Sequence, residues 1–414
     1  MQHEHSLVAI QDEPLVLEPG AKSQRGFFGW FEANKPTATS ADDTCWIDAA
    51  LALPEAICPP WPAKIAVIYP APSLFSTASL LKTEELDAAE IRAFFGADPR
   101  HAEHEDGKPW SFFTARGSHV VLREKELKVL RPHGHLLRSG SSLTPDESAM
   151  TSTAWMGGVF HSMVTQGHVS INRLLSTCHS YLGLFRSHGQ RVFIEIDHCW
   201  TLLGIPSAFE MSQDSCRWIY KHHGGVIEVV SSAPDDCHEL RLSISILHGT
   251  AVRFLISHHV AIHGDDGSAS VPVRYEMHGD AVFVRAIADS DVGRRFPDGG
   301  FLITPSDGTL IDRIGGDELI FTNGLSHQQP FLCFITAPSV TAGLILQGRL
   351  VDESIKQTEN FWETIHSGLR IKAAEKSPLA LAAERTGEIF PWFVHNALVH
   401  YLSPRGLEIG RAHV

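Results

Sequence analysis

The chain has 414 residues, of which 43% are hydrophobic and 20% are charged, so it can bury the core of one very large domain or of two to three ordinary ones. Its 34 basic and 48 acidic residues give a net charge of -14, which disfavours binding to nucleic acid and to anionic membrane surfaces. The amino terminus has no basic stretch followed by an apolar run, and no segment reaches the length of a membrane span. We therefore expect a cytoplasmic protein.

The first predicted element is a helix between Thr83 and Gly96. Thr83 can cap it, two glutamates suit its first turn, and Gly96 can end it. Its apolar positions lie at Leu86, Ile91, Phe94 and Phe95.

From about residue 110 to 350 the pattern is that of β-strands. In residues 238–248, leucine and isoleucine alternate with arginine and serine, which predicts a strand with one buried and one solvated face. Further strands are predicted at 191–196, 226–230, 252–262, 282–287 and 331–336, with turns at 222–225, 265–267, 297–300, 307–308 and 323–324. Many strands joined by short polar turns predict a large antiparallel sandwich.

After residue 350 the period becomes helical. One apolar stripe runs from Val351 to Leu369 and stops at Pro378, a second helical stretch covers 379–385, and a third helix begins near Pro391. This last helix is apolar on most sides, and only thirteen residues follow Tyr401, too few to bury it. We therefore expect the chain to be truncated early in a second domain. The apolar side chains of the third helix are those of Phe390, Phe393, Val394, Ala397, Leu398 and Tyr401.

The seven cysteines form no C-x-x-C pair, and we interpret them as buried small hydrophobic residues rather than as disulfides or zinc ligands. Among the 25 histidines, His259 and His263 are four residues apart, but on a strand that spacing separates the residues by about 13 Å. We predict no metal site. The acidic pairs in 263–267 and 315–318 could serve acid/base chemistry, although a tight turn is the simpler interpretation.

The densest polar segment is residues 160–173. On one continuous strand, Gln166, His168, Ser170 and Asn172 would share a face, and Arg173 follows them. Such planar amides, imidazoles and guanidiniums are suited to binding sugars. The alternative is a polar network that braces a long loop.

Residues 154–173 resemble the cellobiose phosphorylase family, which includes the phosphorylase part of cyclic β-1,2-glucan synthases. The resemblance extends over about residues 25 to 408. It rests on the order of several segments: 27–29 with 37–40, then AWMGGVFHS at 154–162, TQGH at 165–168, SHGQRVF at 187–193, PWFVHNALVHY at 391–401 and PRGLE at 404–408.

This resemblance implies a galactose mutarotase-like β-supersandwich, a helical linker and an (α/α)6 barrel. It divides the chain into a tail at 1–25, the supersandwich at 26–349, the linker at 350–378 and the start of the barrel at 379–414. In the family, a barrel aspartate protonates the glycosidic oxygen while phosphate attacks with inversion. We expect that aspartate to be missing here, because the family pattern is lost after Glu408, so no catalytic residue is assigned.

The implied function is that of the amino-terminal part of an inverting glycoside phosphorylase or related glycosyltransferase acting on β-glucosides. The expected substrate is a disaccharide or oligosaccharide, with phosphate as co-substrate, no other cofactor, and a homodimer in the complete protein. The substrate-binding candidates are Gln166, His168, Asn172, Arg173, Arg405 and Glu408. The alternative is a non-catalytic β-sandwich that binds carbohydrate or mediates dimerisation.

Overall fold

The structure is a computed structural model that describes residues 12–23, 27, 35, 38, 40–54, 71–129, 131–140, 146–167, 172–180, 183–262, 271–350, 392 and 395. The chain divides into two compact units, Met1–Pro70 and Ala71–Val414. Across these described ranges, no helix is long and apolar enough to cross a membrane.

The described residues of the first unit include a short helical segment. A 3-10 turn, η1 (Ala41–Thr44), leads directly into α1 (Cys45–Leu51). Ser40 caps the turn: its hydroxyl accepts a hydrogen bond from the amide of Asp42 at 3.2 Å, and its own amide donates to Asp43 at 2.9 Å. This reciprocal cap satisfies amides that the first turn leaves without a helical partner.

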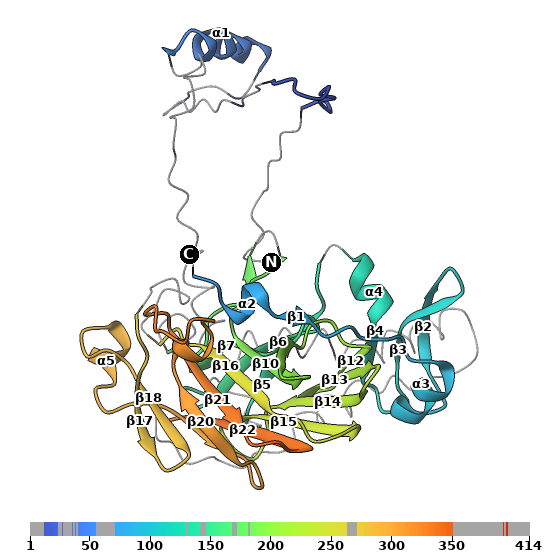
Figure 1. The fold of residues 1–414 in the computed structure, drawn as a ribbon, viewed down its shortest axis with the longest axis vertical. Helices are drawn as coiled ribbons and strands as arrows, with labels where there is room; N and C mark the ends of the chain where they lie inside the picture. Colours follow the sequence, from blue (N-terminus) through green and yellow to red (C-terminus); the bar gives the residue numbers. More distant parts are fainter. Residues whose placement is uncertain are drawn as a thin grey trace. The chain divides into compact units, whose positions relative to one another are not determined.

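The second unit is a β-structure with a few short helices (Figure 1). Among the residues described between 71 and 350, they include α2 (Leu74–Thr77), α3 (Ala88–Phe95), α4 (Arg123–Lys128), α5 (Asp291–Arg295) and the 3-10 turn η4 (Asp317–Leu319).

The predicted early helix exists as α3, but its predicted start is wrong by several residues. Asp87 is the cap: its carboxylate accepts hydrogen bonds from two amides of the first turn at 2.8 and 2.9 Å, while Glu90 accepts one from the amide of Asp87 at 2.8 Å. Thr83 instead donates to the carbonyl of Ile205 at 2.9 Å, a contact across 122 residues. The Thr83 hydroxyl, which the sequence pattern assigned to the helix cap, therefore makes a tertiary hydrogen bond instead. Gly96 ends the helix as predicted.

The largest sheet in the described part has eleven strands. Its order is β17 (Arg274–His278), β18 (Ala281–Arg285), β19 (Gly300–Pro305), β22 (Thr341–Gly348), β15 (Glu239–His248), β14 (Gly225–Ser232), β13 (Ser215–His222), β12 (Ala208–Met211), β4 (His119–Leu122), β3 (Lys108–Phe113) and β2 (Arg100–Glu105). All these neighbours are antiparallel.

A second sheet has six strands, and two small sheets complete the described set. The six-stranded order is β1 (Ser79–Leu80), β11 (Cys199–Leu202), β10 (Gln190–Ile196), β16 (Phe254–His259), β21 (Phe331–Thr336) and β20 (Ile311–Gly315). The small sheets are β5 (Gly134–Arg138), β6 (Met150–Trp155) and β7 (Val159–Gln166), and the pair β8 (His179–Ser180) and β9 (Gly183–Leu184). The pair β1 and β11 is parallel, unlike the other strand pairs described.

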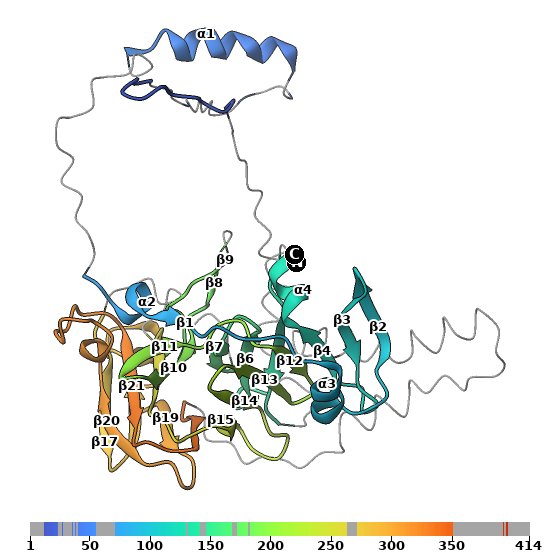
Figure 2. The ribbon, with the colours of Figure 1, turned by 45° about the vertical axis from the view of Figure 1, so that its right-hand side comes forward.

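The mainly β, antiparallel architecture predicted from the sequence is confirmed. In β15, Leu240, Leu242 and Ile244 are buried while Arg241 and Ser243 are exposed, as the alternation predicted. The three-stranded sheet joins the two large ones, because β7 contacts β10 on one side and β14 on the other, and β6 contacts β15 (Figures 1 and 2). Side chains from all three sheets therefore form one main core.

Trp218 on β13 lies in this core and fixes the position of the β12–β13 hairpin. Its ring centroid lies 4.9 Å from those of Phe160 and Phe209, and its indole N–H donates to the carbonyl of Trp155 at 3.1 Å. The buried ring is thus packed and hydrogen-bonded.

The cysteines only partly match their interpretation as buried hydrophobic residues. Cys178, Cys216 and Cys333 are buried, but Cys45 and Cys199 are exposed. Cys199 lies at the start of β11, at the tight turn after β10, where the side chain has no neighbouring layer to pack against.

Candidate functional site

The first candidate is the polar segment that ends β7. The side chain of Gln166 is buried, and both ends of its amide are used inside the protein: Oε1 accepts from the amide of Leu350 at 2.9 Å, and Nε2 donates to the carbonyl of Ser148 at 3.2 Å. The amide group also fills the space beside Gly348, where a Cβ would lie 2.3 Å from it. These are the contacts of a brace that links β7 to the end of β22.

The prediction that Gln166 and Asn172 share one strand face is wrong. β7 ends at Gln166, and Gly167 adopts a φ of 67°, which a residue with a Cβ rarely adopts. The chain turns back, so that the amide of Gln166 donates to the carbonyl of Asn172 at 3.2 Å and Asn172 Nδ2 donates to the carbonyl of Gln166 at 2.9 Å. The glycine conformation, not the polar pattern, decides the geometry.

The other residues proposed for substrate binding are distributed as follows. Arg173 is 6% exposed and pairs with Thr165 in an isolated antiparallel bridge. His168, Arg405 and Glu408 lie outside the described residues. Their contact with a sugar stays a prediction.

Replacing Gln166 distinguishes bracing from sugar binding. In Gln166→Met, the amide of Leu350 and the carbonyl of Ser148 lose their partner, so we expect the free energy of unfolding to fall by about 2 kcal/mol or more. Urea denaturation followed by circular dichroism measures this change. The matched control is Gln328→Met at an exposed position. Unchanged stability with weakened sugar binding would instead support direct contact with the sugar.

The acidic pair in the 315–318 turn has a structural use. Asp317 is buried, and its carboxylate accepts hydrogen bonds from Ser326 Oγ at 2.7 Å and from the amides of His327 and Gln329 at 2.7 and 2.9 Å. Glu318 accepts from the amide of Gly316 at 3.0 and 3.1 Å. The turn interpretation therefore holds for this pair, and the pair at 263–267 lies outside the described residues.

His259, singled out in the sequence as half of a possible metal pair, is a hydrogen-bonded strand residue. Its Nδ1 lies 3.0 Å from Ser176 Oγ, and its ring stacks on that of His188 at 4.3 Å. Within the part of the chain that the structure describes, no group of three or more His, Cys, Asp or Glu side chains is arranged to hold a metal ion.

A hollow of about 740 Å³ lies at one end of the second unit, beside the eleven-stranded sheet. The carboxyl end of α3, the turn between β3 and β4, and the turn between β12 and β13 form its lining, together with Trp392. Its volume falls within the ~300–1,000 Å³ typical of small-molecule sites.

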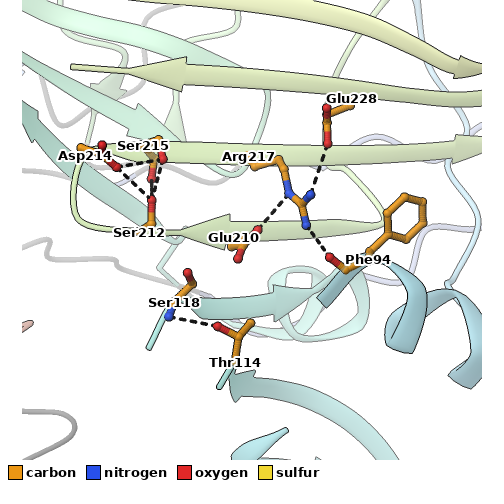
Figure 3. Close-up of polar contacts among 9 residues, drawn as sticks. All are labelled: Phe94, Thr114, Ser118, Glu210, Ser212, Asp214, Ser215, Arg217 and Glu228. Atoms are coloured by element: carbon orange, nitrogen blue, oxygen red, sulfur yellow. Dashed lines mark hydrogen bonds and ion pairs between the residues drawn. The ribbon is translucent and has the colours of Figure 1, made fainter. Parts of the chain in front are cut away.

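Arg217 on β13 lines this hollow, and neighbouring groups hold its guanidinium (Figure 3). Its Nη2 donates to the carbonyl of Phe94 at 2.9 Å and its Nη1 to Glu228 Oε1 at 3.3 Å. Its Nε lies 2.9 Å from Glu210 Oε2, an ion pair without hydrogen-bonding geometry. The guanidinium also lies 5.1 Å from the ring centroid of Phe95. Four contacts from three elements therefore hold one planar cation.

The turn between β12 and β13 presents two hydroxyls and a carboxylate (Figure 3). Ser212 Oγ and Ser215 Oγ lie 3.4 and 3.2 Å from Asp214 Oδ1, and the amide of Ser212 donates to the carbonyl of Ser215 at 2.8 Å. The turn is thus ordered by its own hydrogen bonds.

The turn between β3 and β4 forms the facing part of the lining. The amide of Thr114 donates to the carbonyl of Ser118 at 2.8 Å, and Thr114 Oγ1 accepts from the amide of Ser118 at 3.2 Å. Gly117 has a φ of 87°, which closes this turn. Ala115 and Arg116 between them are exposed.

Trp392 and His395 belong to the helix predicted from Pro391, and both contact the supersandwich. The ring of Trp392 lies 5.1 Å from that of His135 and 6.5 Å from that of Phe113. His395 is buried, stacks on His135 at 5.0 Å, and donates through Nε2 to the carbonyl of Leu136 at 2.9 Å. The predicted apolar face of the same helix lies outside the described residues.

Sequence reasoning did not single out the hollow. Its lining comes from segments that lie at residues 92–96, 114–118 and 210–217, together with Val230 and Trp392, and the 114–118 and 212–215 segments each resemble an ordinary polar turn. The available signal was the short polar run at 212–215 between two alternating strands, which by itself predicts only a hairpin.

Comparison with known proteins identifies the class to which this fold belongs. Residues 98–348 match the family model described as the glycoside phosphorylase supersandwich domain, which corresponds to most of the described β-structure. The chain belongs to this family of glycoside phosphorylase supersandwich domains, and the resemblance noted in the sequence is thereby confirmed at the level of the glycoside phosphorylases.

Two individual proteins show likeness to the chain. A 1,2-beta-oligoglucan phosphorylase from Listeria innocua serovar 6a is 28% identical over 313 residues, which make up 74% of this chain and 28% of that protein. The chain therefore spans less than a third of this relative's length. A solved structure from the human microbiome, named for kojibiose phosphorylase, is 10% identical with a TM-score of 0.31, over 73% of this chain and 39% of that one.

Proposed function

We propose that this chain supplies the supersandwich domain of an inverting glycoside phosphorylase that acts on β-linked glucosides, with inorganic phosphate as co-substrate. The observation that carries the proposal is the family match over residues 98–348. The name of the Listeria relative points to β-1,2-linked oligoglucans as the substrate class. We further propose that the complete protein is a cytoplasmic homodimer.

The general acid of the proposed reaction lies outside the described supersandwich. Such an acid has to remain protonated near neutral pH, which requires a raised pKa. Every carboxyl group with a displaced pKa in the described part of the chain has it displaced downward, as hydrogen-bond donors do for Asp87, Asp146 and Glu103. These groups are therefore unsuited to donate a proton to a glycosidic oxygen. The proposal assigns that step to an (α/α)6 barrel.

Only one protein carboxyl group is needed in the proposed reaction. An inverting hydrolase uses a second carboxylate to activate water, whereas phosphate is itself the nucleophile here. The supersandwich would bind and orient the sugar and help to exclude water from the site.

The product of the reaction tests the proposal. A protein that carries this supersandwich together with its barrel should convert β-1,2-linked oligoglucans and phosphate into sugar 1-phosphate with the α configuration, as NMR of the anomeric proton would record. The 414-residue chain alone should release none. A β-configured product would contradict inversion, and turnover by the purified chain alone would place the acid within it.

The second candidate is a non-catalytic module that binds carbohydrate or mediates dimerisation. The hollow with its polar lining favours it, because all of the lining residues belong to this chain. Sugar binding by the chain, without phosphorolysis when a barrel is present, would support this candidate over the first.

A further inference from the structure

We propose that the hollow lined by α3, the β3–β4 turn and the β12–β13 turn binds a stretch of neutral oligosaccharide. This inference rests on the proposed function, because it assigns that domain a glucan-binding surface of its own.

The charges of the lining balance, which favours a neutral ligand. The lining contains three arginines, Arg92, Arg116 and Arg217, and two acidic residues, Glu210 and Asp214. A third acidic residue, Glu228, accepts a hydrogen bond from Arg217. Arg217 is already shared between two carboxylates, so its charge is compensated. A phosphate or a carboxylate ligand would compete with Glu210 and Glu228 for the same guanidinium. A polyol would not.

The polar groups of the lining are ordered before a ligand arrives. Arg217 is held by Phe94, Glu210 and Glu228, and the two serines are held by Asp214. Pre-ordered groups lose little conformational entropy on binding, which raises affinity for a flexible glucan. The Asp214 carboxylate has about four acceptor positions, and the serines use two of them, so it can accept from a sugar hydroxyl.

The wall of the hollow supplies an apolar surface. Trp392 and Phe94 are both half-buried lining residues, and Trp392 is supported from behind by His135 and Phe113. A pyranose ring carries hydroxyls at its edge and C–H groups on its faces. A few polar groups around an aromatic wall are complementary to both.

Binding by the 414-residue chain tests the proposal directly. The probe is a short linear β-1,2-linked glucan, titrated against the chain by calorimetry. In Ala115→Trp, an indole at an exposed position of the β3–β4 turn would occupy part of the hollow while leaving the other lining residues in place. We expect it to weaken binding at least about tenfold. The matched control is Ala288→Trp, which fills a different hollow, of about 580 Å³, beside Arg274 and Arg285.

The outcomes separate this proposal from the proposed function. Binding that Ala115→Trp weakens and Ala288→Trp preserves supports the site. Equal affinity in the wild type and Ala115→Trp, loss in Ala288→Trp alone, or no binding at millimolar probe would overturn it. Inorganic phosphate is titrated in parallel, and binding of phosphate without the glucan would also overturn it. Phosphorolysis by the domain with its barrel is read from the product, so it can succeed or fail independently.

Discussion

We expect the chain to lose most of its stability as the pH falls from about 6.5 to about 5. Four buried histidines carry this expectation. Burial lowers the pKa of His161 and of His258 to about 4, and that of His135 and of His259 to about 3, with the neighbouring His395 and His188 adding to the effect in the latter two.

The sign follows from proton binding. In the unfolded chain these imidazoles take up a proton near pH 6.5, whereas in the folded chain they stay neutral until about pH 4 or 3. The contribution of these neutral imidazoles to the free energy of unfolding is complete above pH 6.5. It is lost as the pH falls toward their pKa values in the folded chain. Between pH 6.5 and pH 5, proton uptake by each histidine lowers the free energy of unfolding by about 2 kcal/mol, so the four together lower it by about 8 kcal/mol. That is comparable to the whole stability of a typical domain, about 5–15 kcal/mol.

Urea denaturation at a series of pH values between about 7.5 and about 5, a range that includes the ordinary histidine pKa of about 6.5, measures this loss. The slope should correspond to the uptake of at least about four protons on unfolding, since burial also lowers the pKa of His119 to about 4. His161→Gln is the control variant, because an amide can replace the ring in its contacts with Ser152 Oγ at 2.9 Å and the carbonyl of Arg241 at 3.1 Å. The number of protons taken up on unfolding should be lower by about one in His161→Gln. Stability that does not change over this range would contradict the expectation, since carboxylates titrate lower.

The second large effect is expected at Arg191, a buried arginine on β10. It donates to four backbone carbonyls: Nη1 to Gly157 at 3.0 Å and Gly158 at 3.2 Å, Nη2 to Phe185 at 2.5 Å, and Nε to His188 at 3.2 Å. Burial lowers its pKa to about 10, so it remains charged at neutral pH. The side chain ties the β6–β7 turn to the loop before β10.

Replacing Arg191 by methionine leaves those carbonyls without this donor, at one buried and three part-buried contacts. An unsatisfied buried acceptor costs about 1–3 kcal/mol, and we expect the free energy of unfolding to fall by roughly 4 kcal/mol. The midpoint of urea denaturation records the change. Arg313→Met is the matched control at an exposed site on β20 and should stay within about 0.5 kcal/mol of the wild type. A similarly small change in the free energy of unfolding of Arg191→Met would show that the loop before β10 keeps its conformation without the arginine.

The sheet architecture was predictable because it depends on local regularities. Residues that alternate along β15 lie on opposite faces of any strand, and a run such as Phe331–Thr336 is apolar enough to be buried on both. Turn residues such as those at 222–225 and 307–308 mark where strands end. These properties act within a few residues, so the sequence alone is enough to predict them.

The assignment of polar side chains required the tertiary structure. Thr83 and Gln166 have partners that lie 122 and 184 residues away, and no local pattern indicates such partners. The candidate hollow is similar: Arg217 joins α3 to two strands only after the sheet has formed. The sequence by itself determined which segments form strands, how they alternate and which family they belong to. The tertiary structure decided which polar groups brace the fold and which line a hollow, because hydrogen bonds and ion pairs depend on distances in space that the chain sets only when the sheets pack.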